Sequence, residues 1–129
     1  MIEPPPPPGE GGSPPVLDRT AMTELREMTG GDAAFLAELV ETFLAESPVL
    51  LDEMRVAVAS GDAVTLRRAA HTLKANCRTF GAGALAALCE GIEIRAAAGD
   101  LTDIAPVIES ATGLYPAVAS ALRAEVVTP

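Results

Sequence analysis

Apolar residues recur every three or four positions through most of the chain, which is the period of an amphipathic helix. No segment shows the strict alternation of a strand, and no internal repeat is present. The longest apolar stripe has acidic residues on the opposite side and consists of Phe35, Leu36, Leu39, Val40, Phe43, Leu44, Leu50, Leu51, Met54 and Val58. The pattern therefore predicts an all-α fold.

Glycine, proline and aspartate divide the first half of this pattern into helices. A short leading helix is expected over residues 17–28, and Asp32 then caps a long helix that ends at Gly61. Pro48 lies inside this long helix and cannot donate a backbone hydrogen bond, so we expect a kink, or a restart with Ser47 as the cap.

The second half predicts three more helices. The helix over residues 62–80 has a narrow apolar seam of Leu66, Ala70, Leu73, Cys77 and Phe80. The next helix stops at Gly99, and the last runs from about Thr102 to Val126, where Gly113 and Pro116 are expected to bend or split it. Short links between long helices predict an antiparallel up-down four-helix bundle with a short leading helix.

Length and composition limit the chain to one domain. Of 129 residues, with 11 prolines and 11 glycines in all, residues 1–15 hold seven of the prolines and three of the glycines. This segment cannot form a core, so we expect a disordered tether over residues 1–15 and a single folded domain over residues 16–126.

The net charge of −9 disfavours partners that carry many negative charges, such as nucleic acids and anionic membrane surfaces. The longest uncharged run, Ser110–Leu122, is shorter than the roughly 20 residues of a membrane span, and the start lacks the features of a secretion signal. Cys77 and Cys89 lie in apolar helical patterns without metal-ligand spacing, which predicts two buried free thiols. We expect a cytoplasmic monomer without metal or cofactor.

Candidate chemistry centres on His71, the single histidine. At 100° per residue, with the seam at zero, Arg67, His71, Lys74 and Arg78 lie at roughly 100°, 140°, 80° and 120°. The histidine should therefore point away from the core, beside cations that could hold a phosphoryl group. No acid lies between Asp62 and Glu90, and we expect the acids to lie away from His71.

Other mechanisms find no support in the sequence. A single histidine excludes a two-histidine metal site, no serine or cysteine is placed to use it as a base, and no glycine-rich nucleotide loop is present. The residues favour a phosphoryl acceptor that binds no nucleotide, although a merely solvated polar helix face remains an alternative.

The segment Ala70-His71-Thr72-Leu73-Lys74, with Gly81 ten residues after the histidine, resembles the histidine-containing phosphotransfer (HPt) domain family. The resemblance covers most of residues 16–126 and implies that His71 takes a phosphoryl group on Nε2 from a receiver-domain aspartate. It implies that Lys74 stabilises the phosphoryl oxygens and that Gly81 opens the turn beside the site. Ala75 stands where the family usually has glycine, and its methyl group could tune which receivers fit.

The leading hypothesis is thus a phosphorelay carrier, not an enzyme, whose partners are response-regulator receiver domains and a (hybrid) histidine kinase. Arg67 and Arg78 are candidates for receiver docking or phosphate contact. Two alternatives stay open: the phosphoacceptor domain of a chemotaxis-type histidine kinase, which Thr79-Phe80-Gly81 also resembles, and an adaptor bundle whose histidine is never phosphorylated.

Overall fold

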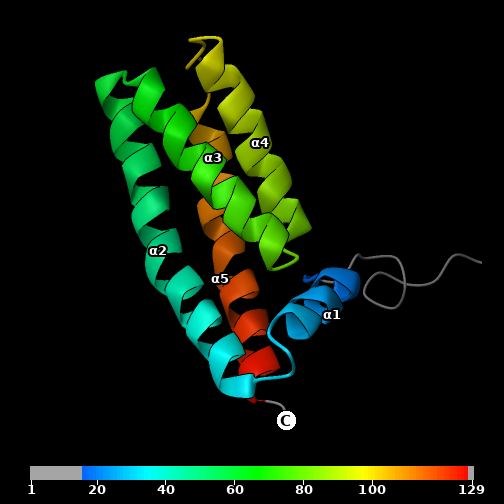
Figure 1. Ribbon diagram of the computed structural model, residues 1–129. Coiled ribbons are helices and arrows are strands. Elements are labelled where there is room, and N and C mark those ends of the chain that lie inside the picture. The colour runs from blue at the N-terminus through cyan, green and yellow to red at the C-terminus, as the bar shows by residue number, and fades with distance from the viewer. Residues whose placement is uncertain (1–15, 128–129) are drawn as a thin grey trace, which may run out of the picture.

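The computed structural model describes residues 16–127, and the tether expected over residues 1–15 lies outside the described residues. Within the described part the chain forms five helices and no strand, which confirms the all-α prediction (Figure 1). The helices are α1 (Arg19–Met28), α2 (Ala33–Ser60), α3 (Ala63–Thr79), α4 (Gly83–Ala97) and α5 (Ala105–Val127). No helix of this part has the length and apolar character needed to cross a membrane.

The four long helices contact one another in a ring. Helix α3 packs against α2 and α4, and α5 packs against the same two helices on the other side (Figure 1). Arg55 of α2 reaches Glu109 of α5, with Nε 3.4 Å from Oε1, and Leu44 of α2 contacts Tyr115 of α5. The later residue of α2 lies beside the earlier residue of α5, so these two helices are antiparallel.

Local signals set the helix boundaries as the sequence predicts. The carboxylates of Asp18, Asp32 and Asp62 accept hydrogen bonds from backbone N–H groups in the first turns of α1, α2 and α3. Gly61 ends α2 with a φ of 71°, a left-handed conformation that favours glycine. The caps at Asp32 and Asp62 and the stop at Gly61 are therefore confirmed.

The predicted seam of α3 forms the centre of the core. Every member of the seam (Leu66, Ala70, Leu73, Cys77 and Phe80) is buried. The thiols of Cys77 and Cys89 are both free and buried, as expected. Hydrogen bonding to Cys89 and burial raise the pKa of the Cys77 thiol, which favours its protonated form in the apolar core.

The expected restart of α2 at Pro48 is wrong, because α2 continues through it as one helix. Pro48 lacks the N–H that would bond the carbonyl of Leu44, and the hydroxyl of Tyr115 from α5 donates to that oxygen instead, at 3.3 Å. Ser47 is not a cap; its side chain is buried and donates to the carbonyl of Phe43 at 2.7 Å.

The last helix is likewise not split at Gly113 or Pro116. Buried residues occur on both sides of this pair, with Ala111 before it and Val118 and Leu122 after it. One continuous apolar face therefore holds α5 against the bundle, and this packing outweighs the local preference to break.

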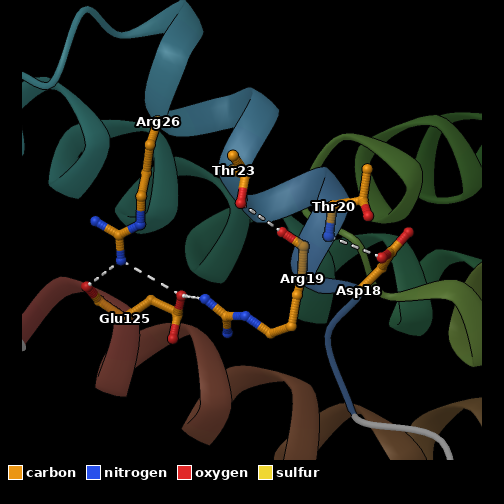
Figure 2. A network of polar contacts seen from close by, with 6 residues as sticks. All are labelled: Asp18, Arg19, Thr20, Thr23, Arg26 and Glu125. Carbon is orange, nitrogen blue, oxygen red and sulfur yellow. Dashed lines mark hydrogen bonds and ion pairs between the residues drawn. The ribbon is translucent and has the colours of Figure 1, made fainter.

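Helix α1 lies against one end of the bundle, near the C-terminal end of α5 (Figure 1). Its buried side chains Met22 and Leu25 join the common core. Figure 2 shows two guanidinium groups of α1 converging on Glu125 of α5: Arg19 contacts Oε1 at 2.6 Å, and Arg26 contacts the same oxygen at 3.3 Å and the backbone carbonyl at 3.0 Å. Hydrogen bonding to Arg19 and then to Arg26 lowers the pKa of Glu125 and keeps it ionised as their partner.

Candidate functional site

His71 lies in the middle of α3, on the side turned away from the buried seam. Its side chain is 63% exposed, which leaves the ring open to a second protein. The imidazole is not free to rotate, however, because its Nδ1 lies 2.6 Å from Oε2 of Glu93 in α4. The histidine is therefore both accessible and held in one orientation.

Glu93 joins the histidine to the lysine of the predicted motif. Its second oxygen, Oε1, lies 2.5 Å from Nζ of Lys74, so one carboxylate bridges the two side chains. Lys74 and Glu93 are only 13% and 16% exposed, respectively. The hydrogen bonds from Lys74 and then His71 lower the pKa of Glu93, so the carboxylate is ionised.

The expectation that the acids lie away from His71 is wrong. Arg78 of α3 pairs with Glu90 of α4 at 3.6 Å, and His71 pairs with Glu93, so the two helices run antiparallel. This register places the acids of α4 beside the basic flank of α3. The sequence carries one signal for it, since Glu90 and Glu93 are three residues apart and thus on one face of their helix.

The contact with Glu93 determines which ring nitrogen can react. An ionised carboxylate only accepts hydrogen bonds, so it holds the hydrogen of the neutral imidazole on Nδ1. The lone pair of the neutral ring then lies on Nε2. A partner that approaches the exposed ring meets a nucleophilic nitrogen that is already oriented, as in the carboxylate–histidine pairs of metal sites.

The other predicted residues are distributed around this centre. Arg67 lines a surface hollow of about 340 Å³ together with Val64, Arg68, His71 and Glu93. Arg78 lies beyond the Lys74–Glu93 pair and is tied to Glu90. Ala75 is exposed one helical turn from the histidine.

Gly81 has a structural role in the turn between α3 and α4. Its φ is 75°, and its carbonyl accepts a hydrogen bond of 2.8 Å from the backbone N–H of Asp18. A Cβ at this position would lie 3.0 Å from both the N and the O of Asp18 and 3.1 Å from Cβ of Ala21. Glycine is needed because the start of α1 passes directly against the turn.

Comparison with known families agrees with this geometry. The model of the Hpt domain matches residues 38–126, more than half of the chain, so the chain belongs to the Hpt domain family. Among solved structures, it is similar to the crystal structure of histidine-containing phosphotransfer protein B (HptB) from Pseudomonas aeruginosa PAO1. The TM-score is 0.79, with 29% identity over 88% of this chain and 96% of that chain. A search of curated proteins found no match.

Proposed function

We propose that this chain carries phosphoryl groups in a phosphorelay and that Nε2 of His71 is the atom that accepts them. The lone pair of Nε2 attacks the phosphorus of a receiver's aspartyl phosphate, the N–P bond forms, and the aspartate leaves as a carboxylate. A second receiver aspartate takes the group in the reverse step. The observation that carries this assignment is the exposed ring whose Nδ1 is held by Glu93.

Glu93 and Lys74 support the reaction without touching the incoming phosphorus. When Nε2 attacks, the ring keeps its hydrogen on Nδ1 and gains positive charge, which the adjacent carboxylate stabilises. Lys74 holds the other oxygen of that carboxylate. Glu93 is thus a positioning residue for the histidine, while Lys74, whose ammonium group keeps two further N–H donors, also stabilises the phosphoryl oxygens that the receiver brings.

Several broader assignments belong to the same proposal. Residues 16–126 form one HPt domain, an antiparallel up-down four-helix bundle, which the ring of helix contacts and the antiparallel pairs α2/α5 and α3/α4 support. The chain acts as a monomeric carrier with no catalysis of its own, and receiver domains and a histidine kinase are its partners. The exposed Ala75 methyl would lie within the surface that a receiver covers.

Phosphotransfer from a purified, phosphorylated receiver domain tests the proposal. The wild-type chain should gain acid-labile phosphate, whereas His71→Gln should gain none. Equal labelling of the two proteins, or no labelling of the wild type by any receiver of the source organism, would contradict it. Labelling by the ATP-binding domain of a kinase, and by no receiver, would assign the chain to the chemotaxis-type alternative.

Replacing Glu93 tests how the histidine is held. Glu93→Gln keeps the size of the side chain but removes the charge that selects hydrogen on Nδ1, so transfer should slow by about tenfold. Glu90→Gln is the matched control, because among residues 16–127 Glu90 pairs only with the more distant Arg78. Nitrogen-15 NMR of the imidazole should show a mixture of tautomers in Glu93→Gln and a single Nδ1–H tautomer in the control.

A further inference from the structure

The family resemblance implies that the ammonium group of Lys74 stabilises the phosphoryl oxygens, and in this structure the same group is paired with a carboxylate. It is largely buried and lies 2.5 Å from Glu93. An ammonium group has three N–H donors, so Lys74 can keep this contact and still donate to a phosphoryl oxygen. Its positive charge is largely offset by the ionised Glu93, however, so a phosphoryl dianion calls for a further cation that has no carboxylate partner.

The hollow beside His71 indicates where that cation should be. Arg67 and Arg68, in the preceding turn of α3, line this hollow together with His71 and Glu93. This placement agrees with the general tendency of helical side chains to lean toward the N-terminus. Since Nδ1 is turned to Glu93, a phosphoryl group on Nε2 belongs on the ring edge that the carboxylate does not occupy.

Charge pairing separates these two arginines from the other cations of the flank. Within residues 16–127, Lys74 pairs with Glu93 and Arg78 with Glu90, whereas no carboxylate oxygen lies within 4.0 Å of Arg67 or Arg68. The sequence of α4 agrees with this difference. Because α3 and α4 are antiparallel, the turn of α4 after Glu93 lies toward the two arginines, and Ala97 in that turn carries no charge.

The two arginines also differ from each other. Hydrogen bonds from Thr65 chiefly lower the pKa of Asp62 at the start of α3, and the charge of Arg68 adds a smaller electrostatic contribution. No such partner is found for Arg67 among residues 16–127. Arg67 is therefore the more available guanidinium for an incoming dianion.

We propose that Arg67, assisted by Arg68, binds the phosphoryl oxygens of phosphorylated His71, in addition to Lys74, which stays paired with Glu93. This inference rests on the proposed function of His71. A phosphoryl group on a side chain carries about two negative charges at neutral pH, and a guanidinium can donate two parallel hydrogen bonds to its oxygens. Arg67 is thus a binding residue for the phosphorylated state, and in the unphosphorylated structure no carboxylate oxygen of residues 16–127 lies within 4.0 Å of it.

Chemical phosphorylation separates this role from receiver docking. Phosphoramidate would transfer its phosphoryl group to Nε2 with release of ammonia, so no second protein is needed. Phosphorus-31 NMR then follows the titration of the bound phosphoryl group. A nearby guanidinium favours the dianion, so in Arg67→Ala the midpoint should move to higher pH, with a smaller shift in Arg68→Ala and none in Arg78→Ala.

Transfer from a phosphorylated receiver gives the second measurement. Arg67→Ala should slow it on the order of tenfold, and Arg67→Lys should restore part of the rate. Arg55→Ala is the control that should remain close to wild type, because Arg55 pairs with Glu109 between α2 and α5 and takes no part in the site. Urea midpoints of all variants show whether the bundle is intact. Equal phosphorus-31 midpoints in Arg67→Ala and wild type would overturn the inference while leaving His71 as the acceptor. A wild-type chain that accepts no phosphate from either donor would overturn both.

Discussion

Gly81 provides a sharp test of how the turn beside the site is built, because Gly61 offers a matched control. Both glycines follow the C-terminal part of a long helix and have nearly the same backbone conformation, with φ values of 75° and 71°. They differ in surroundings: a Cβ at Gly61 meets nothing within 4 Å, whereas one at Gly81 lies 3.0 Å from the backbone of Asp18. Alanine at each position thus separates conformational strain from close packing.

The expected losses follow from these two differences. Left-handed backbone costs an alanine about 1–2 kcal/mol, partly offset by a less flexible unfolded chain, so Gly61→Ala should lower the free energy of unfolding by about 1 kcal/mol. Gly81→Ala has the same strain and must also displace Asp18, whose N–H bonds the Gly81 carbonyl at 2.8 Å. Losing that bond adds about 1 kcal/mol, and partial undocking of α1 adds more. We expect a total of about 2–4 kcal/mol.

Urea denaturation followed by circular dichroism measures both values. The rate of hydrogen exchange at the amide of Met22, a buried residue of α1, gives a local measurement. This rate should increase in Gly81→Ala and stay unchanged in Gly61→Ala. If the two variants lose the same free energy to within about 0.5 kcal/mol, the close approach of α1 to the turn contributes nothing, and the reasoning is refuted.

Three further perturbations address other contacts. Tyr115→Phe should cost about 1 kcal/mol in urea denaturation and clearly less in a Pro48→Ala background, where a backbone N–H replaces the hydroxyl; equal losses would contradict this. Because the pKa of Glu93 is lower in the folded than in the unfolded protein, its ionised form stabilises the fold at a pH above the unfolded-state pKa. This stabilisation is lost as the pH falls through the folded-state pKa. Glu93→Gln should therefore flatten the acid side of the stability profile more than Glu90→Gln does. Glu125→Gln removes the carboxylate that pairs with Arg19 and Arg26, so it should speed hydrogen exchange throughout α1 and make the exchange rates less dependent on salt. Exchange rates equal to those of the wild type would contradict this prediction.

The parts of the fold that sequence predicts well are those with local causes. Asp32 and Asp62 cap their helices through backbone groups only two or three residues away, and the seam around Leu73 follows from helical period alone. The restart expected at Pro48 is absent for a distant reason. The hydroxyl that bonds the carbonyl left free by Pro48 belongs to Tyr115, and no sequence pattern near Pro48 indicates this contact.

The site divides in the same way. The single histidine and its flank of cations are visible on one helix, so His71 could be selected from the sequence and the family resemblance. Glu93 could not be selected in this way. It lies 22 residues from His71 in sequence, and the contact between them depends on the register between α3 and α4. The family motif names the lysine but does not show that its ammonium group faces a carboxylate in this chain.

Arg67, Lys74 and Arg78 illustrate why a helical wheel alone cannot identify the functional cation. On the wheel all three lie on one flank of α3 and are nearly equivalent. The neighbouring helix makes them different, since α4 places a carboxylate opposite Lys74 and another opposite Arg78. If a phosphoryl group on His71 is bound as we propose, it meets the positive charge that remains after this pairing. That charge belongs to Arg67 and Arg68, which line the hollow beside His71.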